Sequence, residues 1–126
     1  MAEIVVADDN EGIRNMLAAL LGQEGHNVRL AADGRQALQL MRQAPADIVV
    51  TDVFMPEQDG LETVMALRKA FPKTAIVVMS GGSRVGYGSD FLDLASQLGA
   101  RAVLAKPFEP DELIAIIADC VADSKR

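Results

Sequence analysis

Residues 47–60 read DIVVTDVFMPEQDG, and this stretch decides the fold class. A short β-branched run stops at the carboxylate of Asp52, and a turn rich in Pro, Asp and Gly follows. An apolar run this short, without polar alternation, is typical of a parallel strand that is covered on both faces. The stretch therefore predicts a buried strand over Asp47–Thr51 with Asp52 directly after it.

Similar strands are predicted on both sides of this one, at residues 4–7, 27–31, 74–79 and 101–105. Apolar stripes at helical spacing follow the strands and predict helices that begin near Ile13, Asp33, Leu61, Asp90 and Pro110. Asp33 and Gln36 have the spacing of a capping box. Five strand–helix alternations predict an α/β fold, a doubly wound, flavodoxin-like parallel sheet of five strands in the order 2-1-3-4-5.

The composition limits the classes of function. The 126 residues suit one domain, residues 1–126, with no separate output domain. A net charge of −6 argues against a nucleic-acid partner, because a phosphate backbone is bound mainly through Lys and Arg. Cys120 is the only cysteine, and no apolar run has the length of a membrane span. We therefore expect a cytoplasmic domain without membrane insertion.

Polar side chains follow four of the predicted strands, namely Asp8 and Asp9, Asp52, Ser80, and Lys106. The carboxyl ends of parallel strands meet at one edge of a sheet, so these groups are expected to lie together. Three carboxylates in one crevice repel one another until a proton or a cation neutralises them. Oxygen ligands without His or Cys favour a hard ion such as Mg²⁺. A carboxylate, a lysine and a divalent ion are together suited to phosphoryl transfer.

The same residues resemble a known family. Asp8-Asp9, Asp52 within DVFMPEQDG, Ser80 and Lys106-Pro107-Phe108 are similar to the receiver domain of bacterial two-component response regulators, over essentially the whole chain. The resemblance implies that Asp52 accepts a phosphoryl group from a phosphohistidine, on a sensor histidine kinase or a histidine phosphotransfer protein. It implies a signalling protein that catalyses only its own phosphorylation and dephosphorylation, and that acts on a downstream protein target.

The resemblance also assigns individual roles. Asp9, Asp52 and the backbone carbonyl of Phe54 would ligate Mg²⁺ directly, and Asp8 largely through water. Ser80 would bond the phosphoryl group and Lys106 would neutralise it, with a cis peptide between Lys106 and Pro107.

Two features depart from the family pattern. Val103 stands where many receivers have an aromatic switch residue, and the loop Ser80–Ser89 is long and Gly-rich. Both lie near the surface that receivers use for output, around the fourth helix, the fifth strand and the fifth helix. How phosphorylation is passed on is therefore open.

These residues also have other interpretations. Taken singly, Asp8-Asp9-Asn10 could cap the first helix, and Asp52 could be one more polar residue at the end of a strand. Ser80 could be a turn residue and Lys106 a solvated cation. A haloacid-dehalogenase-type phosphatase would need a second aspartate where Phe54 stands. A flavin carrier would need small and hydroxyl residues, and Asp8-Asp9 would repel its phosphate.

Several residues outside this set are expected to be structural. His26 has no acidic or cysteine companion in the sequence and is expected to be exposed. Cys120 falls on the apolar stripe of the last helix and is expected in the core. Four methionines are also predicted to fill the core: Met16, Met41, Met65 and Met79.

Overall fold

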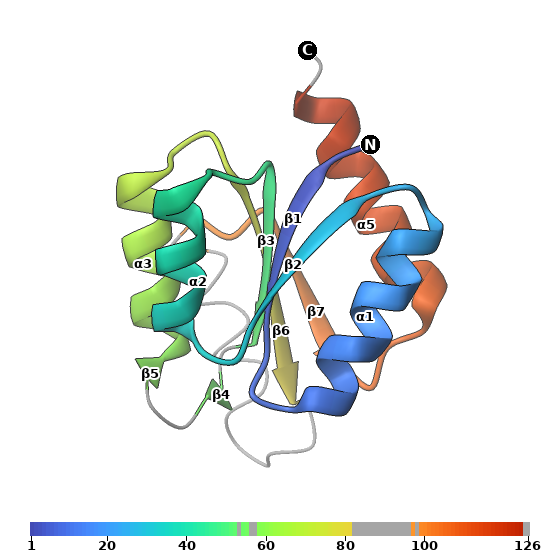
Figure 1. The fold of residues 1–126 in the computed structure, drawn as a ribbon, viewed down its shortest axis with the longest axis horizontal. Helices are drawn as coiled ribbons and strands as arrows, with labels where there is room; N and C mark the ends of the chain where they lie inside the picture. The colour runs from blue at the N-terminus through green and yellow to red at the C-terminus, as the bar shows by residue number, and fades with distance from the viewer. Residues whose placement is uncertain (53, 56–57, 82–96, 98, 125–126) are drawn as a thin grey trace.

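The computed structural model describes residues 1–52, 54–55, 58–81, 97 and 99–124. Its main feature is a parallel sheet of five strands in the order β2-β1-β3-β6-β7. The strands are β1 (Glu3–Ala7), β2 (Asn27–Ala31), β3 (Ile48–Asp52), β6 (Ala75–Gly81) and β7 (Ala102–Lys106). The second strand along the chain is at one edge and the first is beside it, so the predicted order 2-1-3-4-5 is confirmed (Figure 1).

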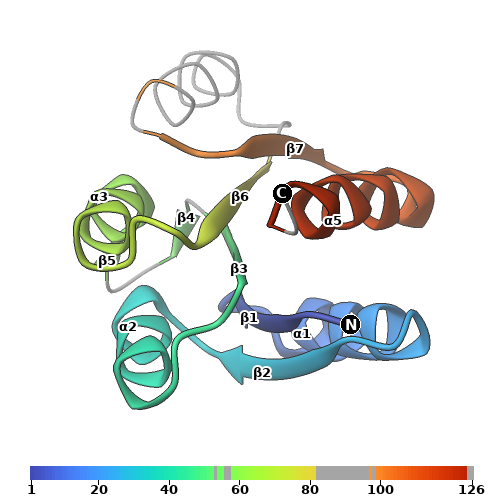
Figure 2. The same cartoon turned by 90° about the horizontal axis from the view of Figure 1, so that it is seen from above.

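Helices cover both faces of this sheet. The described helices are α1 (Glu11–Gln23), α2 (Gly34–Gln43), α3 (Gly60–Ala70) and α5 (Pro110–Ser124). Figure 2 shows α2 and α3 on one side of the sheet and α1 and α5 on the other. The helix predicted to begin near Asp90 lies outside the described residues.

The core is split into two layers by the alternation of side chains along each strand. Val5 and Ala7 of β1 pack into the layer beneath α2 and α3. Ile4 and Val6 pack into the opposite layer with α1 and α5, which also contains Cys120. All five residues of β3 are buried, because this strand is in the centre of the sheet with helices on both faces. The predictions of a covered sheet and of a core cysteine are confirmed.

Local hydrogen bonds explain where two of the helices begin. Asn10 caps α1, and its side-chain oxygen accepts a hydrogen bond from the amide of Ile13 at 3.0 Å. Asp33 caps α2 by accepting from the amide of Gln36 at 2.8 Å, as the capping-box spacing predicts. The Gln36 side chain reaches back to the amide of Ala32. The start of α1 matters most for function, because it fixes the loop that follows β1.

Other expectations are corrected by the structure. The fourth predicted strand runs two residues further, so Ser80 and Gly81 belong to β6 rather than to the following loop. The turn after Asp52 contains a short antiparallel pair, β4 (Phe54–Met55) with β5 (Gln58–Asp59). Such a ladder of two residues per strand is too short to leave a periodic signal in the sequence.

Two of the four methionines are not in the core. Met41 and Met79 are fully buried, whereas Met16 is 50% exposed and Met65 is 54% exposed. The wrong predictions share one cause: both residues lie beside the buried stripe of an amphipathic helix, and spacing alone does not give the width of that stripe.

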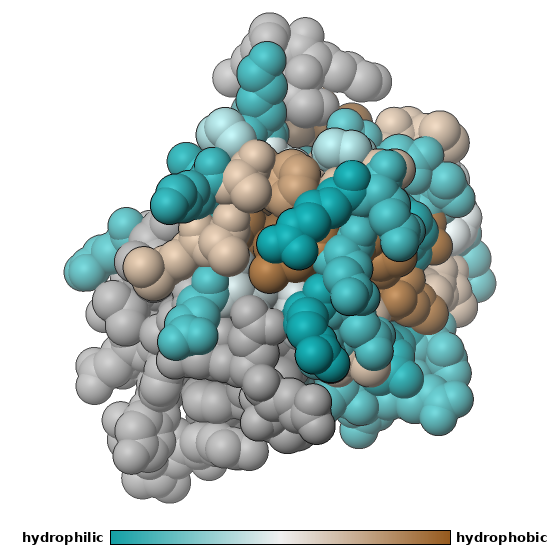
Figure 3. Space-filling model, turned by 60° about the vertical axis from the view of Figure 1, so that its left-hand side comes forward, coloured by the Kyte–Doolittle hydropathy of each residue, from teal (hydrophilic) through white to brown (hydrophobic). Residues whose placement is uncertain are grey.

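The described part of the face that carries α2 and α3 is mainly hydrophilic (Figure 3). Figure 3 brings forward the side that carries α2 and α3, where hydrophilic side chains surround a smaller apolar area. Among the described residues, no helix has the length and hydropathy that crossing a bilayer requires.

Candidate functional site

Three aspartates meet at the carboxyl edge of the sheet. Asp8 follows β1, Asp9 is next to it, and Asp52 ends β3, the neighbouring strand. One carboxylate oxygen from each lies within 4.8 Å of the other two. Asp8 is fully buried and Asp52 is 5% exposed, whereas Asp9 is open to solvent. Two buried carboxylates beside an exposed one form a compact acidic pocket that opens at its Asp9 side.

Lys106 places one positive charge against the two carboxylates in the buried half of this pocket. Its Nζ lies 2.7 Å from Oδ2 of Asp8 and 2.8 Å from Oδ2 of Asp52, so one ammonium donates to both carboxylates. The lysine is at the end of β7, the edge strand, and its side chain reaches past the end of β6 to β3 and β1. The side chain is 18% exposed. The ammonium group is a compact charge on a flexible stem, and two charge-assisted hydrogen bonds hold it in this position.

These contacts alter the protonation of the lysine. Desolvation by burial is the largest single influence and lowers the pKa of Lys106, but the hydrogen bonds and charges of Asp52 and Asp8 together outweigh it. The net effect raises the pKa of Lys106 above its ordinary value of 10.5. The lysine is therefore a cation at every physiological pH.

The loop between β1 and α1 is held by hydrogen bonds to Asp8. The amide of Asn10 donates to Oδ1 of Asp8 at 2.9 Å. Nη1 of Arg14 donates to the carbonyl oxygen of Asp8 at 2.7 Å. With Lys106 on Oδ2, all three oxygens of Asp8 accept a hydrogen bond. Asp8 is thus fixed in position before any cation binds.

Known proteins resemble this chain in sequence. Residues 4–118 match the response regulator receiver domain family. The chain belongs to this family. It is 37% identical over 117 residues to the transcriptional regulatory protein CpxR of Escherichia coli K12, over 93% of this chain and 48% of CpxR. It is 30% identical over 119 residues to a putative NtrX-like response regulator of Rickettsia bellii, over 93% of this chain and 24% of that protein.

A solved structure agrees over nearly its full length. The chemotaxis protein CheY4 of Vibrio cholerae has a TM-score of 0.85 and 31% identity, over 95% of this chain and 98% of CheY4. This chain therefore has the fold of a receiver domain. It spans about a quarter of the NtrX-like relative and about half of CpxR, so their activities as whole proteins are not transferred to it.

The remaining predicted site residues are placed only in part. The backbone of Ser80 pairs with Ala105 of β7, which puts Ser80 at the same edge of the sheet as the aspartates. Phe54 pairs with Asp59 in the short ladder that follows Asp52. Val103 of β7 is half-buried opposite Val78, and the peptide between Lys106 and Pro107 is cis, as the resemblance implies. Most of the loop Ser80–Ser89, from residue 82 on, lies outside the described residues.

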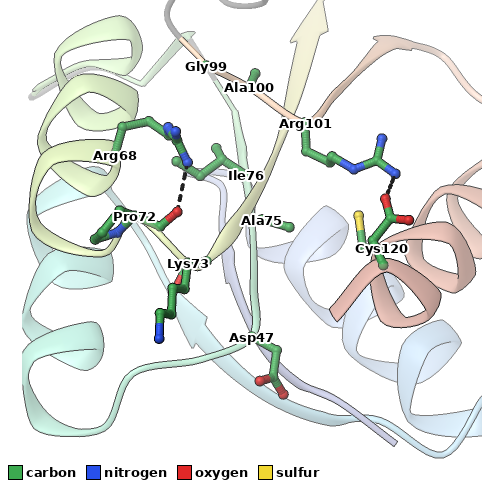
Figure 4. Close-up of a pocket in the computed structure, with 12 residues that line it drawn as sticks. Asp47, Arg68, Pro72, Lys73, Ala75, Ile76, Gly99, Ala100, Arg101 and Cys120 are labelled. Carbon is green, nitrogen blue, oxygen red and sulfur yellow. Dashed lines mark hydrogen bonds and ion pairs between the residues drawn. The ribbon is translucent and has the colours of Figure 1, made fainter. Parts of the chain in front are cut away.

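A cavity of about 440 Å³ lies at the opposite, amino edge of the sheet of this receiver domain (Figure 4). Arg68 and Arg101 flank it, and both guanidinium groups have partners already. Arg68 donates to the carbonyl oxygen of Pro72 at 3.0 Å, and Arg101 pairs with Asp123. Asp47, on its rim, directly precedes β3, and Asp52 ends that strand, so the length of β3 separates this cavity from the acidic pocket.

Sequence reasoning missed two residues of this region. Arg14 and Asn10 both bond to Asp8, and neither was assigned to the site. Asn10 was considered only as part of a possible helix cap, and the structure confirms it as the cap of α1. No sequence pattern indicates the contact of Arg14 with Asp8, because the contact requires a long side chain to fold back over the first turn of its own helix.

Proposed function

We propose that this receiver domain accepts a phosphoryl group on Asp52. The observation that supports this most directly is the contact of Lys106 Nζ with Asp52 Oδ2 at 2.8 Å, beside two further carboxylates. A nucleophilic carboxylate needs a cation that also neutralises the charge of the incoming phosphoryl oxygens. Lys106 can exchange its contact with Asp52 for one with a phosphoryl oxygen without leaving Asp8.

The chemistry balances with a phosphohistidine as the donor. A bond forms between a carboxylate oxygen of Asp52 and phosphorus while the nitrogen–phosphorus bond breaks, and the imidazole leaves with its electron pair and takes up a proton. The product is an acyl phosphate. Asp52 ends a strand that is buried along its whole length, and its carbonyl oxygen accepts from Oγ1 of Thr51 at 3.2 Å. The rigid strand holds the carboxylate in place, and only the charges around it change.

The donor set fits a magnesium ion. Carboxylate oxygens without nitrogen or sulfur ligands are what this hard cation prefers, and the exposed side of Asp9 leaves room for retained water. Asp9 and Asp52 would ligate the ion directly, Asp8 largely through water, and the carbonyl of Phe54 would add a ligand. When bound, the ion would neutralise negative charge that gathers at the phosphoryl group. Ser80 would donate a hydrogen bond from its hydroxyl to the same phosphoryl group.

A sensor kinase and a downstream target are the partners that membership in this family implies. Phosphorylation on Asp52 would alter the face formed around the fourth helix, β7 and α5, with Val103 in place of an aromatic switch. A single-domain chain without an output domain, a cytoplasmic location and the absence of a nucleic-acid partner remain predictions.

The test compares two aspartates at the two ends of one strand. The wild type, Asp52→Asn and Asp47→Asn are incubated with acetyl phosphate and Mg²⁺, and intact mass spectrometry detects a phosphoryl group that base releases. We expect labelling of the wild type and of Asp47→Asn, since exposed Asp47 precedes β3 at the other edge of the sheet. We expect none for Asp52→Asn. Unchanged labelling of a folded Asp52→Asn protein would overturn the assignment.

Asp9→Ala tests the metal. It should weaken Mg²⁺ binding and phosphoryl labelling together, because it removes the exposed ligand and leaves Asp8 and Lys106 in place. Labelling that is unaffected by both this substitution and chelation of Mg²⁺ would contradict a metal at this site.

A further inference from the structure

Arg14 has a contact that the proposed chemistry does not use. It lies in the first turn of α1, and its Nη1 donates to the carbonyl oxygen of Asp8 at 2.7 Å. Its backbone amide donates to the carbonyl of Asn10, the capping residue, at 3.0 Å. The arginine thereby joins the start of the helix to the loop that carries Asp8 and Asp9.

The position is unfavourable for a cation by the rules of helix electrostatics. The amino end of a helix has a partial positive charge, so a cation in the first turn is repelled by it. Arg14 is half-buried, so its long side chain has also lost conformational freedom. A residue that breaks a local rule in this way points to a function.

The oxygen that Arg14 holds belongs to a particular peptide group. The carbonyl of Asp8 and the amide of Asp9 form one planar unit, so fixing that oxygen fixes the plane from which the Asp9 side chain projects. The carboxylate of Asp8 is already held by the amide of Asn10 and by Lys106. For Asp8 itself, the bond from Arg14 is therefore a third restraint.

Asp9 differs from Asp8 in this respect. It is exposed, and no hydrogen bond from a described side chain or backbone amide to its carboxylate is present. Its direction therefore depends on the backbone, and the Asp8–Asp9 peptide is the part of the backbone that Arg14 restrains. We propose that Arg14 is a positioning residue that orients Asp9 for the cation. This inference rests on the proposed function of the acidic pocket.

The sign of the effect separates positioning from charge. If Arg14 acted only as a charge, removing it would reduce repulsion and Mg²⁺ would bind more tightly. If it positions Asp9, removing it weakens binding, by about tenfold at the lower end of the losses seen when a partner of a metal ligand is removed. Arg14→Met keeps the apolar stem and removes the donors. Arg14→Lys keeps the charge and a donor.

Mg²⁺ affinity is measured by calorimetry for the wild type, Arg14→Met, Arg14→Lys and Arg42→Met. Arg42 is an exposed arginine in the last turn of α2, and its replacement is the matched control. We expect about tenfold weaker binding for Arg14→Met, a large recovery for Arg14→Lys, and no change for Arg42→Met. Labelling by acetyl phosphate should be slow for Arg14→Met at low Mg²⁺ and near the wild-type rate at saturating Mg²⁺.

A double-mutant cycle with Asp9→Ala identifies the route of the effect. If Arg14 acts through Asp9, then Arg14→Met changes Mg²⁺ affinity in the wild type and not in the Asp9→Ala background. Equal losses in both backgrounds, or tighter binding by Arg14→Met, would overturn the inference. A wild type that neither binds Mg²⁺ nor is labelled would overturn the proposed function instead.

Discussion

Replacing Lys106 with methionine removes the only cation that contacts both buried aspartates among the described residues. At an effective dielectric constant of about 20, unit charges separated by the 2.8 Å between Lys106 and Asp52 attract by about 6 kcal/mol. Desolvation of the three groups offsets most of that attraction. Removing one partner of a buried ion pair still lowers the free energy of unfolding by about 3–5 kcal/mol, because the other charge is left buried without compensation.

The loss should appear in the metal-free protein. A domain of 126 residues changes its melting temperature by about 4 °C per kcal/mol, so Lys106→Met should melt about 10–20 °C lower in the presence of a chelator. Added Mg²⁺ should recover much of the difference, since a ligand stabilises the state that binds it and the ion no longer competes with an ammonium. Thermal unfolding followed by circular dichroism, with and without Mg²⁺, measures both effects.

Lys69→Met is the matched control. Lys69 is exposed in the last turn of α3, so the same substitution there should leave the melting temperature nearly unchanged. If Lys106→Met melts with the wild type in chelator, and Mg²⁺ stabilises both equally, then the two short contacts do not hold the pocket together and the reasoning fails.

Three further predictions concern the fold. Leu67→Ala on the buried face of α3 should lower the free energy of unfolding, measured by urea titration, by about 2–5 kcal/mol. Met65→Ala on the exposed face of the same helix should lower it by less than about 0.5 kcal/mol. Equal losses would contradict the assigned faces. Gly99→Ala should destabilise the fold more than Gly25→Ala does. Both glycines have positive φ angles, 105° at Gly99 and 88° at Gly25, but an added Cβ at Gly99 would also lie 2.7 Å from Nε of Arg68. Desolvation and the charge of the N-terminus lower the pKa of His26 in the fold, with Glu24 opposing them, so the fold favours the neutral ring. Stability should then fall as pH drops below 6.5 and less so in His26→Gln; parallel pH profiles of the two proteins would refute this.

The sequence was sufficient to predict where the acidic pocket would form. Asp8 follows one strand, Asp52 and Lys106 end two others, and the topology rules for parallel sheets bring those strand ends to one edge. The prediction succeeded because the topology rules constrain the path of the backbone. β1 and β3 are neighbours, and the long side chain of Lys106 covers the distance from the edge strand.

Contacts that depend on a side-chain conformation were not predictable in this way. Arg14 folds back to Asp8, which no spacing rule indicates. The prediction that His26 is exposed was wrong. It is half-buried, and its Nδ1 accepts a hydrogen bond from the amide of Ala2 at 3.1 Å. The partner is a backbone amide close to the chain start, and a search for acidic or cysteine companions could not identify it.

The burial of β3 has a consequence for how the domain can be observed. Its backbone is hydrogen-bonded to a strand on each side, and all five of its side chains are inside. Amides of such a strand exchange with solvent deuterium only when most of the domain opens, whereas loops and edges exchange through local openings. The exchange rates at Val49 and Val50, which are paired on both sides, therefore report the global stability of the protein. Any gain in stability from occupying the pocket would be recorded two residues before the one that we propose to be modified.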